Sequence, residues 1–127
     1  MWYGVRKANV NRHMKIFITG VAGFLGSHLA DLMLSQGHKV AGNDNMIGGY
    51  TDNVPQDVEF HQVDCCDLEN LTKAMDGCDI VYHTAATAYE GLSVFSPVLV
   101  TKNIFEASVT TITAAIRNKV KRIVYCS

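Results

Sequence analysis

The chain has 127 residues, of which 48% are hydrophobic, and its 11 Lys and Arg against 12 Asp and Glu leave a formal net charge of −1. A chain of this length can bury the core of one domain. The near-neutral charge gives no electrostatic basis for binding nucleic acid or an anionic membrane surface. No apolar stretch reaches the roughly 18 residues that a membrane-spanning helix needs, so the sequence predicts no such helix.

The first part of the chain, residues 1–13, has no clear hydrophobic period, and a strand-like run begins only after Met14. We therefore expect Met14 to be the native start, residues 1–13 to be an N-terminal extension, and one domain to cover residues 14–127. The first residues lack the apolar centre of a secretory signal, which favours a cytoplasmic protein. In that compartment we expect reduced, buried thiols at Cys65, Cys66, Cys78 and Cys126. Their spacing suits no zinc site, so we expect no bound metal.

A strand at residues 16–18 leads into a glycine-rich turn that reads TGVAGFLG over residues 19–26. Gly20 allows a sharp turn, Gly23 leaves the backbone open to a phosphate, and Gly26 lets the following helix lie close to the strand. A plain structural turn can contain the same glycines. The order strand, turn, amphipathic helix nevertheless favours a dinucleotide pyrophosphate held at the helix N-terminus.

An acidic residue, Asp44, ends the second predicted strand, at residues 39–43. It follows Gly26 at close to the spacing of about 20 residues at which a carboxylate binds the adenosine ribose hydroxyls in dinucleotide-binding folds. A carboxylate there would repel a 2′-phosphate, and no Arg occurs between Arg12 and Arg117 to accept one. NAD is therefore favoured over NADP. The alternative is that Asp44 simply begins the polar loop that follows.

The remaining elements alternate between strands and helices. We predict a strand at 58–64, a helix at 68–75 capped by Asp67, a strand at 80–84, a loop at 85–97, a helix at 100–118 and a strand at 121–126. Ile104, Ser108, Ile112, Ala115 and Ile116 are expected to form the packing stripe of the long helix. This order predicts the α/β class: a Rossmann-type doubly wound parallel sheet, incomplete, with five strands in the order 3-2-1-4-5.

With these motifs in hand, residues 14–127 resemble the N-terminal part of an extended short-chain dehydrogenase/reductase of the NAD-dependent nucleotide-sugar epimerase/dehydratase family. The matching segments are the TGVAGFLG turn, the pair Asp44-Asn45, the DCCD stretch at 64–67, the HTAA stretch at 83–86 and the final segment 120–127. The resemblance implies the same fold and NAD as the cofactor. It also implies homodimers formed through helices that include the long one.

The resemblance assigns cofactor-binding roles residue by residue. Backbone amides of Phe24 and Leu25 would meet the pyrophosphate, Asp44 and Asn45 the adenosine ribose, and Asp64 and Cys65 the adenine. The nicotinamide ribose side would be lined by Thr84, Ala85, Ala86 and Thr87, and Asn103 would also bind the cofactor. Each residue has a plainer alternative: Asp64 as a helix cap, the alanines as packing residues, and His83 as a buried structural histidine rather than an acid–base group.

The catalytic Tyr-x-x-x-Lys pair of such a family follows the fifth strand, and residues 14–127 contain no such spacing. Tyr3 and Lys7 have the spacing but precede the first strand, which is the wrong place in the fold. The resemblance therefore implies a cofactor-binding portion, with no catalytic residues, of an enzyme that moves hydride between a sugar carbon and nicotinamide. The nucleotide-sugar substrate would be bound by a later region. The alternative is a non-catalytic dinucleotide-binding module or an inactive truncated gene product.

Overall fold

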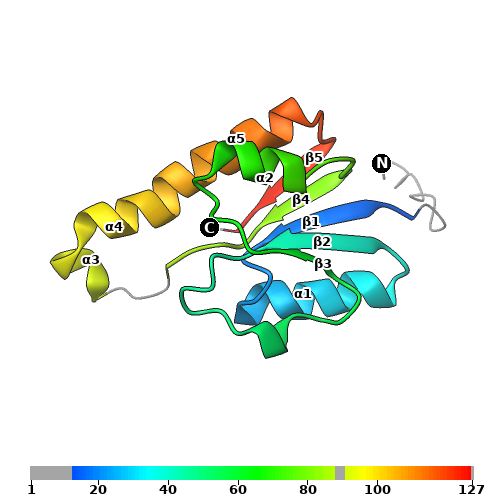
Figure 1. Cartoon of the computed structure of the whole chain (residues 1–127), viewed down its shortest axis with the longest axis horizontal. Coiled ribbons are helices and arrows are strands. Elements are labelled where there is room, and N and C mark those ends of the chain that lie inside the picture. Colours follow the sequence, from blue (N-terminus) through cyan, green and yellow to red (C-terminus); the bar gives the residue numbers. More distant parts are fainter. Residues whose placement is uncertain (1–12, 88–90, 127) are drawn as a thin grey trace, which may run out of the picture.

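Five parallel strands form one sheet at the centre of the computed structural model, which describes residues 13–87 and 91–126 (Figure 1). The order is β3-β2-β1-β4-β5, as the sequence predicts. All neighbouring strands are parallel. Residues 1–12 of the predicted extension lie outside the described residues. The strand bounds are β1 Lys15–Thr19, β2 Lys39–Asn43, β3 Glu59–His61, β4 Ile80–His83 and β5 Arg122–Tyr125.

Helices cover both faces of the sheet (Figure 1). On one face lies α1 (Phe24–Ser35), and on the other lie α2 (Leu68–Ala74) and α5 (Ala107–Arg117). Successive residues of β1 point to opposite faces, so Phe17 joins one hydrophobic cluster and Ile16 and Ile18 join the other. This two-sided burial explains why the central strands are almost entirely apolar.

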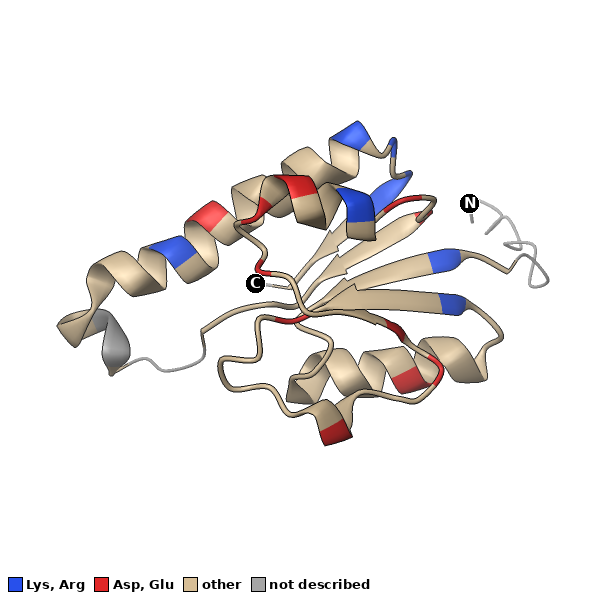
Figure 2. Ribbon diagram, viewed as in Figure 1, with Lys and Arg blue, Asp and Glu red and all other residues tan. Residues whose placement is uncertain are grey.

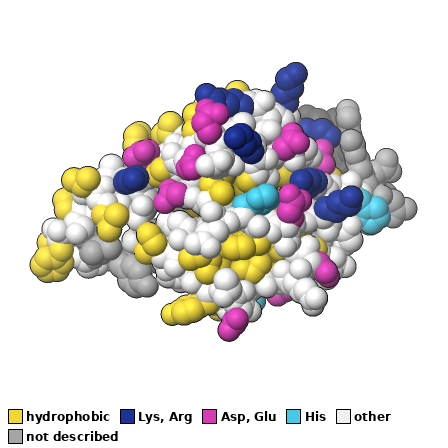
Figure 3. Space-filling model, viewed as in Figure 1, with side chains coloured by type: hydrophobic (Ala, Val, Ile, Leu, Met, Phe, Trp, Pro, Cys, Tyr) yellow, Lys and Arg dark blue, Asp and Glu magenta, His cyan; other side chains and the backbone are white. Residues whose placement is uncertain are grey.

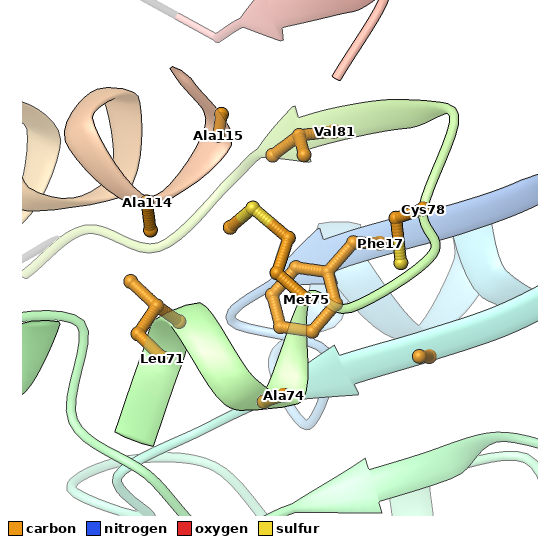
Figure 4. Packing of buried hydrophobic residues seen from close by; sticks show 9 residues of the cluster. Phe17, Leu71, Ala74, Met75, Cys78, Val81, Ala114 and Ala115 are labelled. Atoms are coloured by element: carbon orange, nitrogen blue, oxygen red, sulfur yellow. The ribbon is translucent and has the colours of Figure 1, made fainter. Parts of the chain in front are cut away.

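The larger cluster packs the α2–α5 layer against the sheet. Figure 4 shows the side chain of Met75 extending between Phe17 of β1 and the alanines of α5, Ala114 and Ala115. Met75 is fully buried. Truncating such a side chain to alanine typically costs about 2–5 kcal/mol of stability because it leaves a cavity.

Local sequence accounts for the ends of α2. The Asp67 side chain accepts a hydrogen bond from the amide of Asn70 at 3.2 Å, which confirms the predicted N-cap. After the helix, Gly77 has a φ of +72°, a left-handed conformation that glycine adopts without strain.

The sequence prediction is wrong about part of the long helical segment. The expected loop at 85–97 contains a short helix, α3 (Leu92–Phe95), and the start of α4 (Pro97–Thr101). A proline fits the first turn of a helix because its missing N–H has no partner there anyway. A π-helical turn, η2 (Lys102–Glu106), then joins α4 to α5.

The predicted packing stripe of this helix is also wrong, apart from Ala115. Ile104, Ile112 and Ile116 are exposed, and Ser108 is half-buried. The buried face consists instead of Ala107, Thr111, Ala114 and Ala115. Small side chains let α5 approach α2 and β4 closely, so size rather than hydrophobicity decided which face packs.

The cysteine prediction holds only in part. Cys65 and Cys78 are buried, but Cys66 is half-buried and Cys126 is exposed. Cys126 follows β5, which is the last strand of the described sheet, so less of the fold covers it. Among the described residues, no helix combines the length and the hydrophobicity that crossing a bilayer requires.

Candidate functional site

A cleft of about 440 Å³ opens at the carboxyl ends of the central strands. The chain order reverses between β1 and β4, which makes this edge the topological switch point where ligands bind in such sheets. The cleft lining includes every residue for which the sequence predicts a cofactor role: Gly20, Gly23, Phe24, Leu25, Gly26, Asp44, Asn45, Asp64, Cys65, Thr84, Ala85, Ala86, Thr87 and Asn103. The structure thus brings together residues from five separate segments, and the role of each remains a prediction.

Further lining residues were not singled out from the sequence: Asn43, Ile47, Gly48, Gly49, Leu99 and Ala107. For the glycines of the loop after β2, the sequence provided a weak indication of a ligand-binding role, because small residues in a long loop can approach a ligand. For Leu99 and Ala107, the sequence provided no such indication. They reach the cleft with Asn103 because the helix that bears all three runs past its edge.

The glycine-rich turn is shaped by close backbone approaches. Gly20 has a φ of +71°, and a Cβ placed on it would lie 2.9 Å from Cα of Ala85. A Cβ on Gly26 would collide with the carbonyl of Gly20. By contrast, a Cβ on Gly23 would meet only the Gly20 carbonyl, at 3.3 Å. Gly20 and Gly26 are therefore required by the fold, whereas Gly23 chiefly keeps the surface of the turn open.

The turn presents the N-terminus of α1 to the cleft. Gly23 is the N-cap, and the amide of Ser27 bonds to its carbonyl at 3.0 Å. The amides of the first turn before Ser27 consequently lie at the open end of the helix. That end has no acidic residue and no side-chain cap. Its partial positive charge is available to an anionic group of a ligand.

The carboxylate of Asp44 joins the turn to the end of β2. One oxygen accepts from the amide of Ala22 at 3.1 Å and the other from the amide of Met46 at 2.8 Å. The loop that follows Asp44 folds back against the glycine-rich turn. Tyr50 N and Asn53 Nδ2 both donate to the Ala22 carbonyl at 3.2 Å. Asp44 is therefore a fixed, largely buried acceptor at the edge of the cleft.

A second carboxylate, Asp64, lies at the turn between β3 and α2. It accepts from the amide of Cys66 at 2.8 Å and from Asn45 Nδ2 at 3.3 Å. Partial burial raises the pKa of the Asp64 carboxyl, but these hydrogen bonds outweigh it and leave the pKa below its ordinary value. Asp64 is thus ionised at neutral pH and can accept a donor from a ligand. Burial also raises the pKa of the neighbouring Cys65 thiol, which makes it an unreactive apolar surface.

The other end of the cleft follows β4. The Thr84 hydroxyl donates to the Thr19 carbonyl, and Asn103 Nδ2 donates to Thr87 Oγ1 at 3.0 Å. Asn103 lies in the π-helical turn η2, a distortion that occurs often at functional sites. His83 is buried, with Thr19 Oγ1 beside Nδ1 and Ser108 Oγ beside Nε2. The interpretation of His83 as a structural histidine agrees with these contacts.

The charged residues in the cleft lining are both carboxylates. No Lys or Arg is among its described residues. Figure 2 shows basic residues at the amino ends of β1 and β2, at the opposite edge of the sheet from the cleft. Across the described ranges, His, Cys, Asp and Glu side chains form no group of three that could hold a metal ion. Phosphate binding here would depend on backbone amides.

The strand order, the glycine-rich turn and the cleft at the switch point define a Rossmann-type domain. A family model for the NAD dependent epimerase/dehydratase family matches residues 16–127, and the chain belongs to this family.

Curated relatives include a probable UDP-arabinose 4-epimerase from Arabidopsis thaliana, 31% identical over 88% of this chain and 30% of its own length. A UDP-glucose 4-epimerase from Halalkalibacterium halodurans is 33% identical over 90% of this chain and 34% of its own. The chain therefore spans about a third of the length of these relatives.

Solved structures of epimerases are similar to this chain in fold and sequence. A Thermus thermophilus UDP-glucose 4-epimerase in complex with NAD matches with a TM-score of 0.84 and 34% identity, over 90% of this chain and 37% of that one. A Thermotoga maritima UDP-glucose 4-epimerase with UDP-glucose matches with a TM-score of 0.85 and 29% identity, over 88% of this chain and 37% of that one.

Proposed function

We propose that the cleft binds NAD across the carboxyl ends of the strands. One observation carries this proposal: the same cleft contains the uncapped N-terminus of α1 and, at the end of β2, the fixed carboxylate of Asp44. The first suits a pyrophosphate and the second suits ribose hydroxyls. The residues present therefore fit the dinucleotide. The NAD-bound relative from Thermus thermophilus supports the choice of ligand.

We propose a preference for NAD over NADP on electrostatic grounds. A 2′-phosphate beside Asp44 would place two negative charges together, and no cation in the described lining would compensate. The backbone donors of Ala22 and Met46 already hold the carboxylate in place. It therefore could not turn away to make room without breaking those bonds.

We propose that the whole protein acts on a nucleotide sugar, as an epimerase or dehydratase. When bound, NAD would supply the hydride acceptor for oxidation of a sugar carbon. Residues of this chain would hold the pyrophosphate at α1, the adenosine at Asp44 and Asp64, and the nicotinamide ribose beside Thr87 and Asn103. Because residues 14–127 carry no Tyr-x-x-x-Lys pair, we expect residues 1–127 to show no turnover alone.

Calorimetry with purified 1–127 tests the cofactor proposal, with NADP as the comparison ligand. Saturable binding in which NAD is preferred supports it. Binding of neither ligand by a chain whose circular dichroism shows it to be folded would refute it. Assays with UDP-glucose and NAD on the same sample test the expected inactivity, and measurable epimerisation would contradict the assignment of catalysis to another region.

We further propose that the protein forms a homodimer through the long helical segment. Apolar side chains line a groove along it, from Pro97 and Val98 to Phe105 and Val109. Figure 3 shows hydrophobic side chains gathered at the end of the molecule where α3 and α4 lie in Figure 1. An exposed apolar surface of this kind favours association. A cytoplasmic location is also proposed, supported by the free thiols of the described residues.

A further inference from the structure

The turn between β3 and α2 is tied to β2 by a side chain rather than by the backbone ladder. The ladder ends at the pair Asn43 and His61. Beyond it, the His61 carbonyl accepts from the amides of both Asp44 and Val63, at 3.2 and 3.0 Å. The chain thus leaves the sheet earlier than the predicted strand at 58–64. The Val63 carbonyl instead accepts from Asn43 Nδ2 at 2.8 Å.

The same amide makes a second contact in this turn. Nδ2 of Asn43 lies 3.3 Å from Sγ of Cys65, so its two N–H groups reach two acceptors. The side chain is 1% exposed, and its Oδ1 has no hydrogen-bond partner among the described residues. Exchanging the amide oxygen and nitrogen would set two oxygens against each other at Val63. The carbonyl of Val63 therefore fixes the orientation of the amide.

A buried amide with an unpaired oxygen lowers the stability of the folded chain, whereas an apolar residue at the end of this central strand would not. The amide of Asn43 nevertheless provides two hydrogen-bond donors. Both donors act on residues 63–65, the segment that carries Asp64 into the cleft. Asn45, which follows Asp44 in the sequence, donates a hydrogen bond from Nδ2 to the carboxylate of Asp64 at 3.3 Å.

We propose that Asn43 is a positioning residue for the adenine end of the cleft: its buried amide holds residues 63–65 in the binding arrangement before a cofactor arrives. This inference rests on the proposed function, in which Asp64 and Cys65 face the adenine. A turn that is ordered in advance loses less conformational entropy on binding, and the affinity rises accordingly. Asn43 itself need not touch the ligand.

The test replaces Asn43 by an apolar side chain of similar size, Asn43→Leu. Hydrogen exchange of the Cys66 and Asp67 amides is measured without ligand, because both donate within this turn, to Asp64. We expect these two amides to exchange at least about tenfold faster in the variant, while amides of β1 and β4 keep their rates. Unchanged exchange at Cys66 and Asp67 would overturn the proposal.

Binding provides the second readout. We expect Asn43→Leu to raise the Kd for NAD and for AMP by about the same factor, roughly tenfold, as the loss of one buried hydrogen bond suggests. Nicotinamide mononucleotide, followed by NMR titration, should bind as it does to the wild type, because it lacks the adenine. Equal weakening of all three ligands would contradict a local role.

The matched control is Thr113→Val on α5. The Thr113 hydroxyl donates within its own helix, to the Val109 carbonyl at 2.8 Å, and valine has nearly the shape of threonine. We expect wild-type exchange and affinity in this variant. Should Asn43→Leu fail to fold, Asn43→Thr replaces it, since threonine favours strands but is too short to reach Val63. If wild-type chain fails to bind NAD, the proposed function fails, while the exchange experiment still decides the role of Asn43.

Discussion

The hydroxyl oxygen of Thr19 lies 2.7 Å from Nδ1 of His83, across the adjacent carboxyl ends of β1 and β4. The same oxygen accepts from the amides of Thr84 and Ala85, at 3.1 and 3.2 Å. Because these donors occupy its lone pairs, its proton points to Nδ1, which must be the unprotonated nitrogen. The proton of the neutral imidazole is then on Nε2, 3.1 Å from Ser108 Oγ. His83 therefore joins β1, β4 and α5 as a neutral group.

Stability should accordingly depend on pH through His83. Burial lowers the pKa of its imidazole in the folded state. The unfolded chain, with a histidine pKa of about 6.5, then binds more protons than the folded chain as the solution becomes acidic. The stabilisation is fully present above the unfolded pKa and is lost as the pH falls through the folded one. We expect the free energy of unfolding to fall between about pH 7 and pH 5.

NMR titration of the imidazole signals checks this directly, with the exposed His28 as an internal comparison. A midpoint for His83 at or above the ordinary histidine value would contradict the neutral assignment. In His83→Asn, which cannot titrate, the loss of stability on acidification should be smaller than in the wild type, whatever the stability of the variant at neutral pH.

Asp44→Arg should weaken NAD binding and shift the preference towards NADP. The carboxylate that would accept the ribose hydroxyls is lost, and a guanidinium can pair with a 2′-phosphate. Losing charge-assisted hydrogen bonds of about 1.5–3 kcal/mol raises the Kd for NAD by roughly tenfold or more.

The ratio of the two dissociation constants is the decisive quantity for Asp44. The side chain also holds the amides of Ala22 and Met46, so any substitution loosens the turn and weakens both ligands together. The exposed substitution Asp31→Lys on α1 makes a change of similar charge away from the cleft and should leave the ratio unchanged. A wild-type ratio in Asp44→Arg would refute the ribose role.

The glycine-rich turn predicts opposite consequences for two of its glycines. Gly23→Val should leave a folded chain that no longer binds NAD, because its Cβ meets little protein but occupies the approach of the pyrophosphate. Gly26→Ala should instead lower the melting temperature, since its Cβ collides with the Gly20 carbonyl. Thermal unfolding and calorimetry on both variants separate the two effects.

Gly91→Ala is the neutral comparison for this pair, because a Cβ there meets nothing within 4 Å. Retained NAD affinity in Gly23→Val would remove the argument that the turn holds the pyrophosphate. An unaltered melting temperature in Gly26→Ala would show that the turn can relax away from the helix.

The parts of this fold that sequence reasoning recovers are those set by local patterns. The strand order follows from alternating elements and the handedness of their crossovers, and the cleft residues follow strand ends, which the apolar runs mark. Gly20, Gly26 and Asp67 could be assigned because a turn, a close approach and a helix cap each demand particular residue types.

The parts that sequence reasoning missed depend on partners far away in the chain. Asn43 reads as an ordinary polar residue before Asp44, and only the early departure of β3 gives it a role. The face of α5 that packs was misjudged because its buried side chains, Ala107, Thr111, Ala114 and Ala115, are small, and hydrophobicity alone does not mark such a face. No local rule foresees the π-helical turn that carries Asn103.

We expect the exposed face of the long helical segment to mediate self-association. This face carries a row of side chains spaced alternately four and three residues apart in the sequence. Lys102 is one member of the row, and the others are the exposed apolar side chains Val98, Phe105, Val109, Ile112 and Ile116. That spacing suits the seam of a helical bundle. Phe105→Glu places a charge in the middle of this row and should shift the protein from a dimer to a single chain.

Light scattering after size-exclusion chromatography measures the mass of each species over a range of concentrations. Asp31→Lys, on the opposite face of the sheet, should keep the wild-type mass, because α1 contributes nothing to the row. The fold should survive Phe105→Glu, since Phe105 is 68% exposed and contributes little to the core. A wild-type chain that stays at the mass of one copy even at millimolar concentration would contradict the proposed homodimer.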